Sequence, residues 1–372
     1  MKICGIVTEY NPFHNGHAYH IQKAKEATNC DVLIAIMSGN FVQRGECAIT
    51  DKWARAKAAI SAGCDLVIEL PYPFVVQRAD IFAKHAVDIL DMAGINSLVF
   101  GSETSDIEHL SKLANTTYEE YQKQRKNGIS MAKTLEKIHG KVNSNDILGM
   151  AYLRAVTNKN ITPIAIQRTN GYHDQDINNT ISSATAIRKA IKEGNCISHT
   201  TNMSEYLTNP VFMEEYYPYI QTLLLTTSKE ELRKRFLVDE GIENLFVKQA
   251  NIHMDWESFI TSCISNRYPR SSIQRSLIHI LTQTNKYEID TLPTCDFLRV
   301  LAFNDIGRKH LKHLKKQEIK IAASFHQIPQ PYRDIFIRIT NAYAYAFDTT
   351  KRKEIMDSEV QSPIYISSCG SY

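Results

Sequence analysis

The sequence predicts an α/β fold, in which a parallel sheet with helices on both faces is followed by an all-helical second half. Through the first 200 residues, short apolar runs of strand length alternate with helical patterns, and the connections between them are short. Such strand–helix–strand units are typical of a doubly wound parallel sheet with right-handed crossovers. Strand-like runs fade after about residue 200. Because 372 residues exceed one typical domain, we expect two, residues 1–200 and residues 201–372.

The expected elements differ in the pattern that predicts them. Residues 31–37, DVLIAIM, are nearly all apolar, as in a parallel strand buried on both faces. Residues 79–93 keep their apolar positions at helical spacing, and Gly94 ends that helix. For the helix over 51–62, Thr50 is the expected N-cap. The remaining strands are expected at 2–7, 64–70, 97–100 and 161–167, and the remaining helices at 16–27, 211–226, 228–239, 243–265, 271–285, 296–303, 307–322 and 332–347.

The composition narrows the class of protein. Apolar residues make up 43% and charged residues 22%, which is ordinary for a globular protein and does not predict disorder. The net charge of +3 permits an acidic partner without requiring one. Eight scattered cysteines lack CxxC or zinc-type spacing, which predicts reduced thiols and no metal site. No apolar run approaches the roughly 18 residues of a membrane span, and no signal peptide is apparent. We therefore expect a cytoplasmic protein with no membrane association, and no pattern indicates a protein partner.

The most informative motif is His14-Asn15-Gly16-His17, which follows the first expected strand and opens the first expected helix. Gly16 lets the backbone approach a ligand closely, and the helix start offers free N–H groups and a positive dipole end to an anion. The two imidazoles are three residues apart, so both can face one side of the first turn. They could stabilise negative charge on an α-phosphate as pyrophosphate leaves. The alternatives are a capped helix start with two exposed histidines, or a zinc site, for which no third ligand has a recognisable spacing.

A second motif, ISSATAIRKAI at residues 181–191, predicts another helix at a phosphate site. Ser182 and Ser183 are expected to cap the helix, and Arg188 could reach phosphate from its first turns. The alternative is a plain capped helix. The chain contains neither a GxxxxGK[ST] segment nor a KMSKS loop, which excludes a P-loop NTPase and counts against a tRNA synthetase.

The two motifs resemble the signatures of the H-x-G-H nucleotidyltransferase superfamily, which binds ATP on a Rossmann-like sheet. A longer series of segments resembles the tRNA(Met) cytidine acetate ligase family. In the first half these are GIVTEYNPFHNGHAYHI, IAIMSGNFVQRGECAITDKWARA, DLVIELP, FGSE, SNDILGMAYLRA and GYHD, and in the second half SNRYPRSSIQRSLIHIL. The resemblance implies that ATP and acetate give acetyl-adenylate. The acetyl group then moves to N4 of the wobble cytidine of elongator tRNA(Met). ATP would be a substrate, with Mg²⁺ on its phosphates.

The resemblance also implies a set of site residues. Catalytic roles fall to His14, His17 and Arg188. Gly101 would let adenosine lie against a strand end, Asn145 would pair with a base or ribose edge, and Arg168 would hold phosphate. For these three residues the alternatives are a turn glycine, a helix N-cap and a surface ion pair. The complete expected ATP site comprises Val7, Thr8, Glu9, Tyr10, Asn11, Pro12, Phe13, His14, Asn15, Gly16, His17, Ala18, Tyr19, His20, Gly101, Asn145, Arg168 and Ser182.

The second step would also need an acceptor for the proton of the cytidine amine, because that amine is a poor nucleophile. His14, His17, Glu9 and Asp174 are all candidates, and the sequence does not choose among them. Arg44, in the loop SGNFVQRGE, is a candidate contact to acetate or to the cytidine, or a solvated loop arginine.

Basic segments predict an RNA-binding surface in the second half. They lie at 229–236, 266–275 and 308–320, and each could instead be a solvated helix face. From these segments we expect tRNA contacts from Arg267, Arg270, Arg275, Lys312 and Lys315. Two other functions stay open. A small-molecule adenylyltransferase would share both motifs, and an RNA-binding protein could retain a vestigial nucleotide site.

Overall fold

A computed structural model describes residues 1–124, 137–138, 140, 142–168 and 181–367. Its centre is a sheet with the strand order β5-β4-β1-β2-β3-β6-β7, and β8 pairs with β6. The first five strands are parallel to one another. This confirms the α/β class and all five strands expected in the first half. Their bounds are β1 Ile3–Thr8, β2 Val32–Ser38, β3 Leu66–Leu70, β4 Ser97–Ser102 and β5 Thr162–Gln167.

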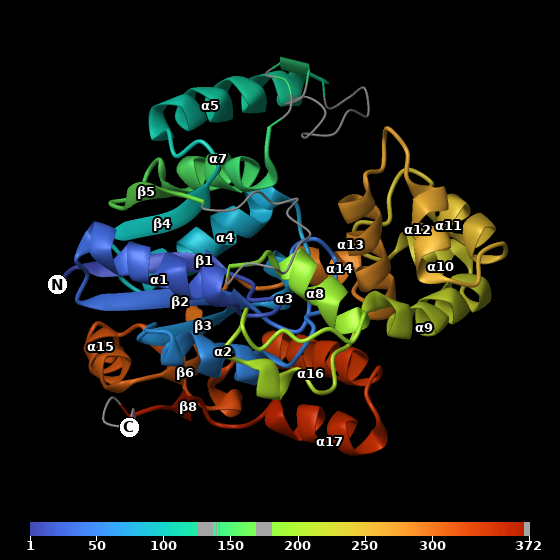
Figure 1. Ribbon diagram of the computed structural model, residues 1–372. Helices are drawn as coiled ribbons and strands as arrows, with labels where there is room; N and C mark the ends of the chain where they lie inside the picture. Colours follow the sequence, from blue (N-terminus) through green and yellow to red (C-terminus); the bar gives the residue numbers. More distant parts are fainter. Residues whose placement is uncertain (125–136, 139, 141, 169–180, 368–372) are drawn as a thin grey trace.

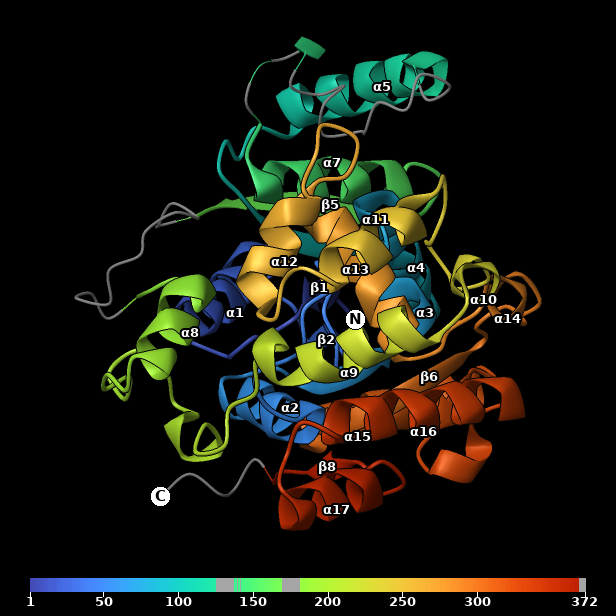
Figure 2. The ribbon, with the colours of Figure 1, turned by 90° about the vertical axis from the view of Figure 1, so that its right-hand side faces the viewer.

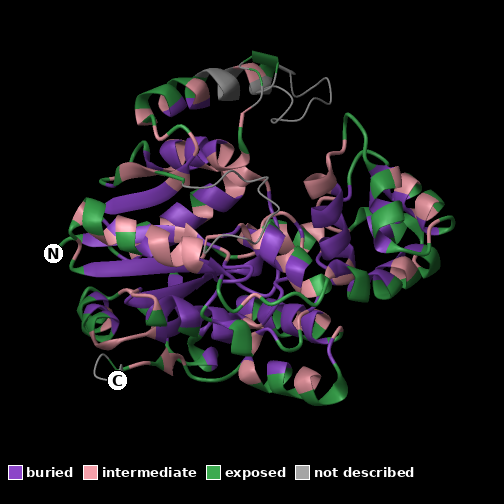
Figure 3. Ribbon diagram, viewed as in Figure 1, coloured by how far each residue is buried: buried purple, intermediate pink, exposed green. Residues whose placement is uncertain are grey.

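Helices cover both faces of the sheet (Figure 1). On β2, the side chains of Ile34 and Ile36 join one hydrophobic cluster with helix α4, and those of Leu33 and Met37 join another with helices α1 and α2. This explains why the run DVLIAIM is almost entirely apolar. Figure 3 shows β1 to β4 and β6 as the buried centre of the molecule, whereas β5 at the edge is partly exposed. The helices up to residue 192 are α1 Asn15–Thr28, α2 Lys52–Ser61, α3 Tyr72–Val75, α4 Ala79–Met92, α5 Ile107–Gln124, α7 Ser144–Val156 and α8 Ala184–Lys192.

The second half is mostly helical, as predicted, but it is not exclusively so. The helix expected at 296–303 is wrong: strand β6, Phe297–Phe303, occupies this stretch and pairs antiparallel with β3. The run FLRVLAF is buried along nearly its whole length, and a short apolar run has no periodicity that separates a strand from a buried helix. The short strands β7, Lys320–Ala322, and β8, Ile364–Tyr365, also pair with β6. The end of the helix expected at 307–322 is therefore wrong as well.

Most helices of the second half form two groups, and α15 packs separately on the sheet. Helices α9 to α13 stand beyond the carboxyl ends of the parallel strands, and Figure 2 shows α9, α12 and α13 in front of the sheet. Helices α16 and α17 pack together below the sheet (Figure 1). The bounds are α9 Met213–Thr226, α10 Lys229–Arg233, α11 Ile242–Ala250, α12 Trp256–Cys263, α13 Arg270–Leu281, α14 Lys286–Asp290, α15 Asp305–Lys316, α16 Gln330–Ala344 and α17 Thr349–Ser358.

Two details of the helix predictions are wrong for reasons of capping. Residues 243–265 form two helices, because the Asp255 side chain accepts from the backbone N–H of Ser258 at 2.9 Å and starts α12. The N-cap of α2 is Asp51, which accepts from the N–H of Ala54 at 2.9 Å, whereas the hydroxyl of Thr50 donates to the carbonyl of Tyr206.

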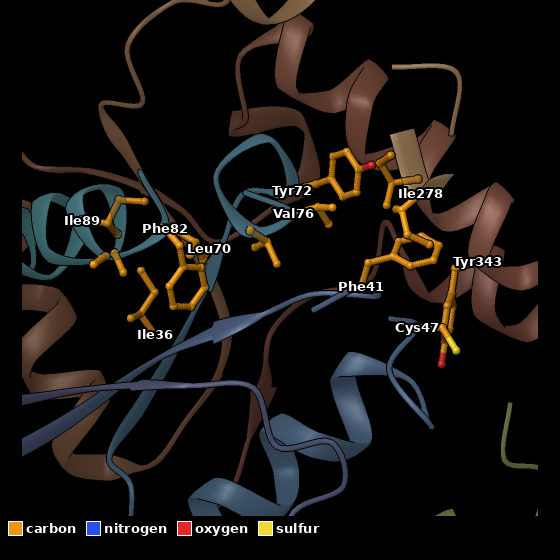
Figure 4. Packing of buried hydrophobic residues seen from close by; sticks show 14 of the residues in the cluster. Ile36, Phe41, Cys47, Leu70, Tyr72, Val76, Phe82, Ile89, Ile278 and Tyr343 are labelled. Atoms are coloured by element: carbon orange, nitrogen blue, oxygen red, sulfur yellow. The ribbon is translucent and has the colours of Figure 1, made fainter. Parts of the chain in front are cut away.

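The hydrophobic core crosses the boundary that we predicted at residue 200. Phe41 and Tyr72 from the first half share one cluster with Ile278 and Tyr343 from the second (Figure 4). The division into residues 1–200 and 201–372 stays a prediction. Within the described residues, no helix is both long and apolar enough to cross a membrane.

A buried ion network fixes the returning strand β6 and helix α17 to the sheet. The Lys52 ammonium lies 2.9 Å from Glu69 and 2.8 Å from Glu359, and the Arg299 guanidinium lies 3.1 Å and 2.7 Å from the same two carboxylates. All four side chains are at most 4% exposed. Two cations and two carboxylates balance in charge, so the network is stable only while it is complete.

Removing one member therefore has a large predicted effect. Glu359→Ala leaves two buried cations facing one carboxylate, and we expect the free energy of unfolding to fall by about 3–5 kcal/mol. Denaturant unfolding measures this. Glu354→Ala, on the same helix but with an exposed side chain, is the control and is expected to change stability by less than about 1 kcal/mol. Equal effects of the two variants would show that the network does not hold α17 in place.

Candidate active site

A cavity of about 270 Å³ opens at the carboxyl ends of the parallel strands. This is where ligands bind in open α/β sheets. Its wall comes from the loop after β1, the loop after β2, the ends of β4 and β5, helix α7 and the start of α8. Most of the residues predicted from the sequence line it, namely Val7, Thr8, Glu9, Tyr10, Asn11, His14, Gly16, His17, Tyr19, His20, Gly101, Asn145, Arg168, Ser182 and Arg188.

Four residues of the predicted ATP site do not line this cavity. Phe13 and Ala18 pack into the hydrophobic cluster formed with α1 and α2, and Pro12 is buried. Asn15 faces the other way, since its side-chain amide donates to the carbonyl of His199 at 2.9 Å. A continuous stretch of sequence was predicted, but a chain that turns into a helix presents only some of its side chains to one side.

The two motif histidines are stacked and hold each other in one orientation. His14 is the N-cap of α1, and its Nδ1 accepts from the N–H of Gly16 at 3.1 Å. The Nδ1 of His17 accepts from the N–H of His14 at 3.3 Å, and the ring centroids are 3.8 Å apart. Because each Nδ1 is an acceptor, the proton of each neutral ring is on Nε2. Both residues are therefore Nε2–H donors at the start of the first helix.

Burial keeps these imidazoles neutral. It lowers the pKa of His14 to about 3, and the positive charges of Arg168 and Arg188 add to the effect. The pKa of His17 is held well below its usual range, by burial first and then by His14, and burial lowers the pKa of His20 to about 4. At neutral pH the pair consequently offers hydrogen-bond donors without adding positive charge.

The glycine between the histidines is required by their geometry. A Cβ atom on Gly16 would lie 2.8 Å from Cε1 and 3.0 Å from Nδ1 of His14. Any side chain there would displace the ring. At Gly101, a Cβ would meet Cγ of Arg168 at 3.3 Å, so the arginine lies directly over the end of β4.

The second motif adopts the predicted local structure. Ser183 is the N-cap of α8 and accepts from the N–H of Ala186 at 3.1 Å, while Ser182 lines the cavity. Arg188, one turn further, donates to the carbonyl of Asn11 at 2.8 Å and pairs with Glu46 at 3.3 Å. The second motif is thus joined directly to the histidine loop.

Asn145 is not the N-cap that the sequence left open, because Asn143 holds that position on α7. The side-chain amide of Asn145 donates to Glu103 at 2.6 Å, at the cavity wall. The Glu103 carboxylate also accepts from the N–H of Asp146 at 3.1 Å. The N–H of Glu103 in turn donates to the Asp146 carboxylate at 3.0 Å, so several hydrogen bonds join the loop after β4 to the start of α7.

A residue that the sequence did not single out organises the cavity. Arg55, on α2, is fully buried and donates to carbonyls in both neighbouring loops. The distances are 2.7 Å to Glu9 and 3.0 Å to Ser38, and a further bond joins it to Gly39. Its Nε donates to Thr50 at 3.1 Å. An arginine between two alanines in the helix KWARAKAAIS was the available signal, but its partners are backbone atoms, which leave no mark in the sequence.

The predicted RNA-binding residues do not form one surface. Arg275 is only 9% exposed, and Arg267 and Arg270 pair with Glu240 and Glu257. Lys312 and Lys315 are exposed, but they lie on α15, on the opposite side of the molecule from α13 (Figure 1). Helix α13 packs against the loop after β2, which lines the cavity at Arg44 and Glu46. Gly45 in that loop adopts φ +75°, and a Cβ there would lie 2.4 Å from the backbone nitrogen of Arg275.

Among the residues that the structure describes, no cluster of three His, Cys, Asp or Glu side chains could hold a metal ion. Asp174, a candidate proton acceptor, lies outside the described residues.

A helix N-terminus, two fixed imidazole donors and two arginines converge on one edge of the sheet, which suits a polyphosphate. The fold and this edge define the class of nucleotide-binding enzymes with a Rossmann-like sheet. Comparison with known proteins agrees, because residues 1–358 match the family of HIGH nucleotidyl transferases. The chain belongs to that family and, within it, to the tRNA(Met) cytidine acetate ligases.

Individual relatives support this assignment over nearly the whole chain. A protein of Geobacillus sp. (strain WCH70), named tRNA(Met) cytidine acetate ligase, is 34% identical over 98% of this chain and 99% of its own length. The protein of that name from Staphylococcus aureus (strain MRSA252) is 38% identical over 85% of this chain and 87% of its own. Two crystal structures of Thermotoga maritima TmcAL, one apo and one bound with alpha-thio ATP, each have a TM-score of 0.88 and 30% identity. Both comparisons cover 99% of this chain and 100% of the other.

We predict that Arg55→Met weakens both the fold and the nucleotide site. The thioether cannot donate, so several buried carbonyls lose their hydrogen bonds at about 1–3 kcal/mol each. Unfolding by urea and ATP affinity by calorimetry measure the two effects. Lys57→Met, on the exposed side of the same helix, is the matched control. An Arg55→Met protein with unchanged ATP affinity would contradict the role given to this side chain.

Stability is predicted to fall as the pH falls below about 6.5. The folded pKa values of His14, near 3, and His20, near 4, lie below that of an unfolded histidine. At a pH between the folded and the unfolded pKa of a histidine, the unfolded chain binds a proton that the folded chain does not. Each such histidine therefore lowers the free energy of unfolding by up to about 1.4 kcal/mol per pH unit. Denaturant unfolding at several pH values measures the slope. His20→Gln should reduce it, and His326→Gln, at an exposed position, should not. Equal slopes for wild type and His20→Gln would contradict the burial of this imidazole as a neutral ring.

Proposed function

We propose that this enzyme activates acetate with ATP and transfers the acetyl group to N4 of the wobble cytidine of elongator tRNA(Met). The first step gives acetyl-adenylate and pyrophosphate, and the second gives N4-acetylcytidine and AMP. The observation that carries the proposal is the pair of Nε2–H donors, His14 and His17, fixed at the start of α1 in the cavity. The names of the relatives and the alpha-thio ATP bound by the Thermotoga protein support it.

The proposed first step needs charge stabilisation more than acid–base chemistry. Acetate is ionised near neutral pH, so it can attack the α-phosphate of ATP without a base. Negative charge then grows on the phosphate oxygens, and donors fixed in advance stabilise it most effectively. His14 and His17 would donate through Nε2, while Arg168 and Arg188 would hold the phosphates as planar forks. Mg²⁺ would be held mainly by the ATP phosphates, since the described residues offer no dedicated cluster of ligands.

The position of the helical region suggests how tRNA reaches the cavity. Helix α13 lies against the loop after β2 at Gly45, so RNA crossing α13 would arrive at the cavity wall. We propose phosphate contacts from Arg267 and Arg270, whose exposed ion pairs can open at little cost. The side chain of Arg275, which is largely buried, would pack beneath this surface instead of contacting RNA directly. Lys312 and Lys315 could contact tRNA only if it also wrapped around the far side of the sheet.

One incubation separates this function from the two alternatives. The protein is mixed with ATP, labelled acetate and a panel of transcribed tRNAs. Label fixed in tRNA(Met) agrees with the proposal. AMP transferred to a small substrate would instead indicate an adenylyltransferase, and tight RNA binding without ATP consumption would indicate a vestigial site.

We expect His17→Ala to abolish acetyl-adenylate formation and to leave tRNA binding nearly intact. The variant loses one donor to the α-phosphate but no part of the helical region, and loss of such a donor costs about 10²–10³ in rate. Acetate-dependent release of pyrophosphate and a filter-binding assay with tRNA measure the two properties. The assignment is wrong if the variant releases pyrophosphate at the wild-type rate.

A further inference from the structure

The proposed transfer step leaves one role unassigned, and this inference rests on that proposed function. When the cytidine amine attacks the acetyl carbonyl, its nitrogen must lose a proton, and an acceptor held in place speeds such a step by about 10²–10⁴-fold. The hydrogen bonds of the candidate proton acceptors show which of them can still take up a proton.

The histidines of the motif are poor acceptors. The Nδ1 atoms of His14 and His17 already accept from backbone N–H groups, at 3.1 and 3.3 Å. Their Nε2 atoms therefore carry the protons and act as donors. Burial also holds their pKa values far below neutrality, so taking a second proton is unfavourable. His20 offers no alternative, because its Nε2 is buried, without a hydrogen-bond partner among the described residues, and burial lowers the pKa of the ring to about 4.

The carboxylates of the cavity wall differ in how they are engaged. Glu46 pairs with Arg188 at 3.3 Å, and Glu103 accepts from Asn145 and from the N–H of Asp146. Glu9 follows the last residue of β1 and also lines the cavity. Its Oε1 accepts a single described hydrogen bond, from the N–H of Gln43 at 2.7 Å.

Glu9 is also held at its backbone. Its carbonyl accepts from the buried guanidinium of Arg55 at 2.7 Å. The residue is therefore fixed at both ends, between the loops that follow β1 and β2. Burial raises the pKa of its carboxyl group, an effect that the N–H of Gln43 and the charge of Arg44 oppose. A carboxylate with a raised pKa is a better proton acceptor than an exposed one.

We propose that the Glu9 carboxylate accepts the proton of the cytidine amine during acetyl transfer. The N4 lone pair forms a bond to the acetyl carbonyl carbon, and the bond from that carbon to the AMP phosphate oxygen breaks. AMP leaves with the electron pair of that bond. The N4 proton moves to Glu9 and from there to solvent, which restores the carboxylate.

The test separates the two steps of the reaction. Glu9→Gln keeps the shape and the acceptor oxygen for Gln43 but cannot take up a proton. Acetate-dependent exchange of pyrophosphate into ATP measures the first step. Single-turnover transfer of acetyl from preformed acetyl-adenylate to tRNA(Met) measures the second. We expect the transfer rate to fall by at least about 100-fold and the exchange rate by less than about 10-fold. Glu9→Asp, which retains a carboxylate, should recover part of the transfer rate.

A matched variant and a chemical trap complete the design. Glu46→Gln removes the neighbouring carboxylate and its ion pair with Arg188, so it should change the two steps together. Hydroxylamine, a small nucleophile that needs no tRNA, should still trap acetyl-adenylate as acetohydroxamate in Glu9→Gln. That result also shows that the variant folds and binds ATP.

Three results would overturn the inference. Unchanged transfer in Glu9→Gln would show that the proton goes elsewhere. Parallel loss of exchange and transfer would show that Glu9 acts on ATP or its metal ion. If hydroxylamine traps acetohydroxamate with the wild type but not with Glu9→Gln, Glu9 likewise acts on ATP or its metal ion. If the wild-type protein itself shows no acetate-dependent exchange, the proposed function fails instead of the role of Glu9.

Discussion

The active-site geometry depends on one buried cation that is held by backbone atoms. The guanidinium of Arg55 donates to carbonyls of Glu9, Ser38, Gly39 and Thr50, which belong to the loops after β1 and β2 and to the approach to α2. The carboxyl ends of two neighbouring strands are thereby fixed to each other. Burial lowers the pKa of the guanidinium, although at neutral pH the group remains charged. Four carbonyls replace the water that this charge loses on folding.

The electrostatics of the cavity follow from that rigidity. The loop after β1 is fixed at Glu9, and the same loop leads into the cap of α1, where the N–H groups of Gly16 and His14 hold the two histidine rings. Rings that are buried and already hydrogen-bonded at Nδ1 stay neutral and donate through Nε2. Positive charge comes instead from Arg168, directly after β5, and from Arg188 on α8. Neutral histidines thus provide oriented donors, and arginines provide the positive charge. This division suits a reaction that needs stabilisation of phosphate charge and, later, a proton acceptor.

Much of the fold was predictable because local patterns carry it. The five parallel strands, the helix over the histidine motif and the cap at Ser183 follow from apolar runs, glycines and capping residues. Strand β6 was missed because a seven-residue apolar run reads equally well as a helix, and only its pairing with β3 decides. Most of the predicted ATP-site residues line the cavity, but other lining residues, such as Gln43 and Tyr152, were not predicted. The contacts of Arg55 and the separation of α15 from α13 depend on residues that are distant in sequence, so no local pattern predicts them. The histidine tautomers follow from local hydrogen bonds within the motif, but only the structure gives the geometry of those bonds.

The central claim is that neutral, Nε2-protonated His14 and His17 hold the α-phosphate of ATP. A crystal structure of this protein at saturating concentration of a non-hydrolysable ATP analogue tests it most directly. We predict α-phosphate oxygens within about 2.7–3.2 Å of both Nε2 atoms, with both Nδ1 atoms still accepting from the backbone. A nucleotide bound elsewhere, or rings turned so that Nδ1 faces the phosphate, would contradict the account.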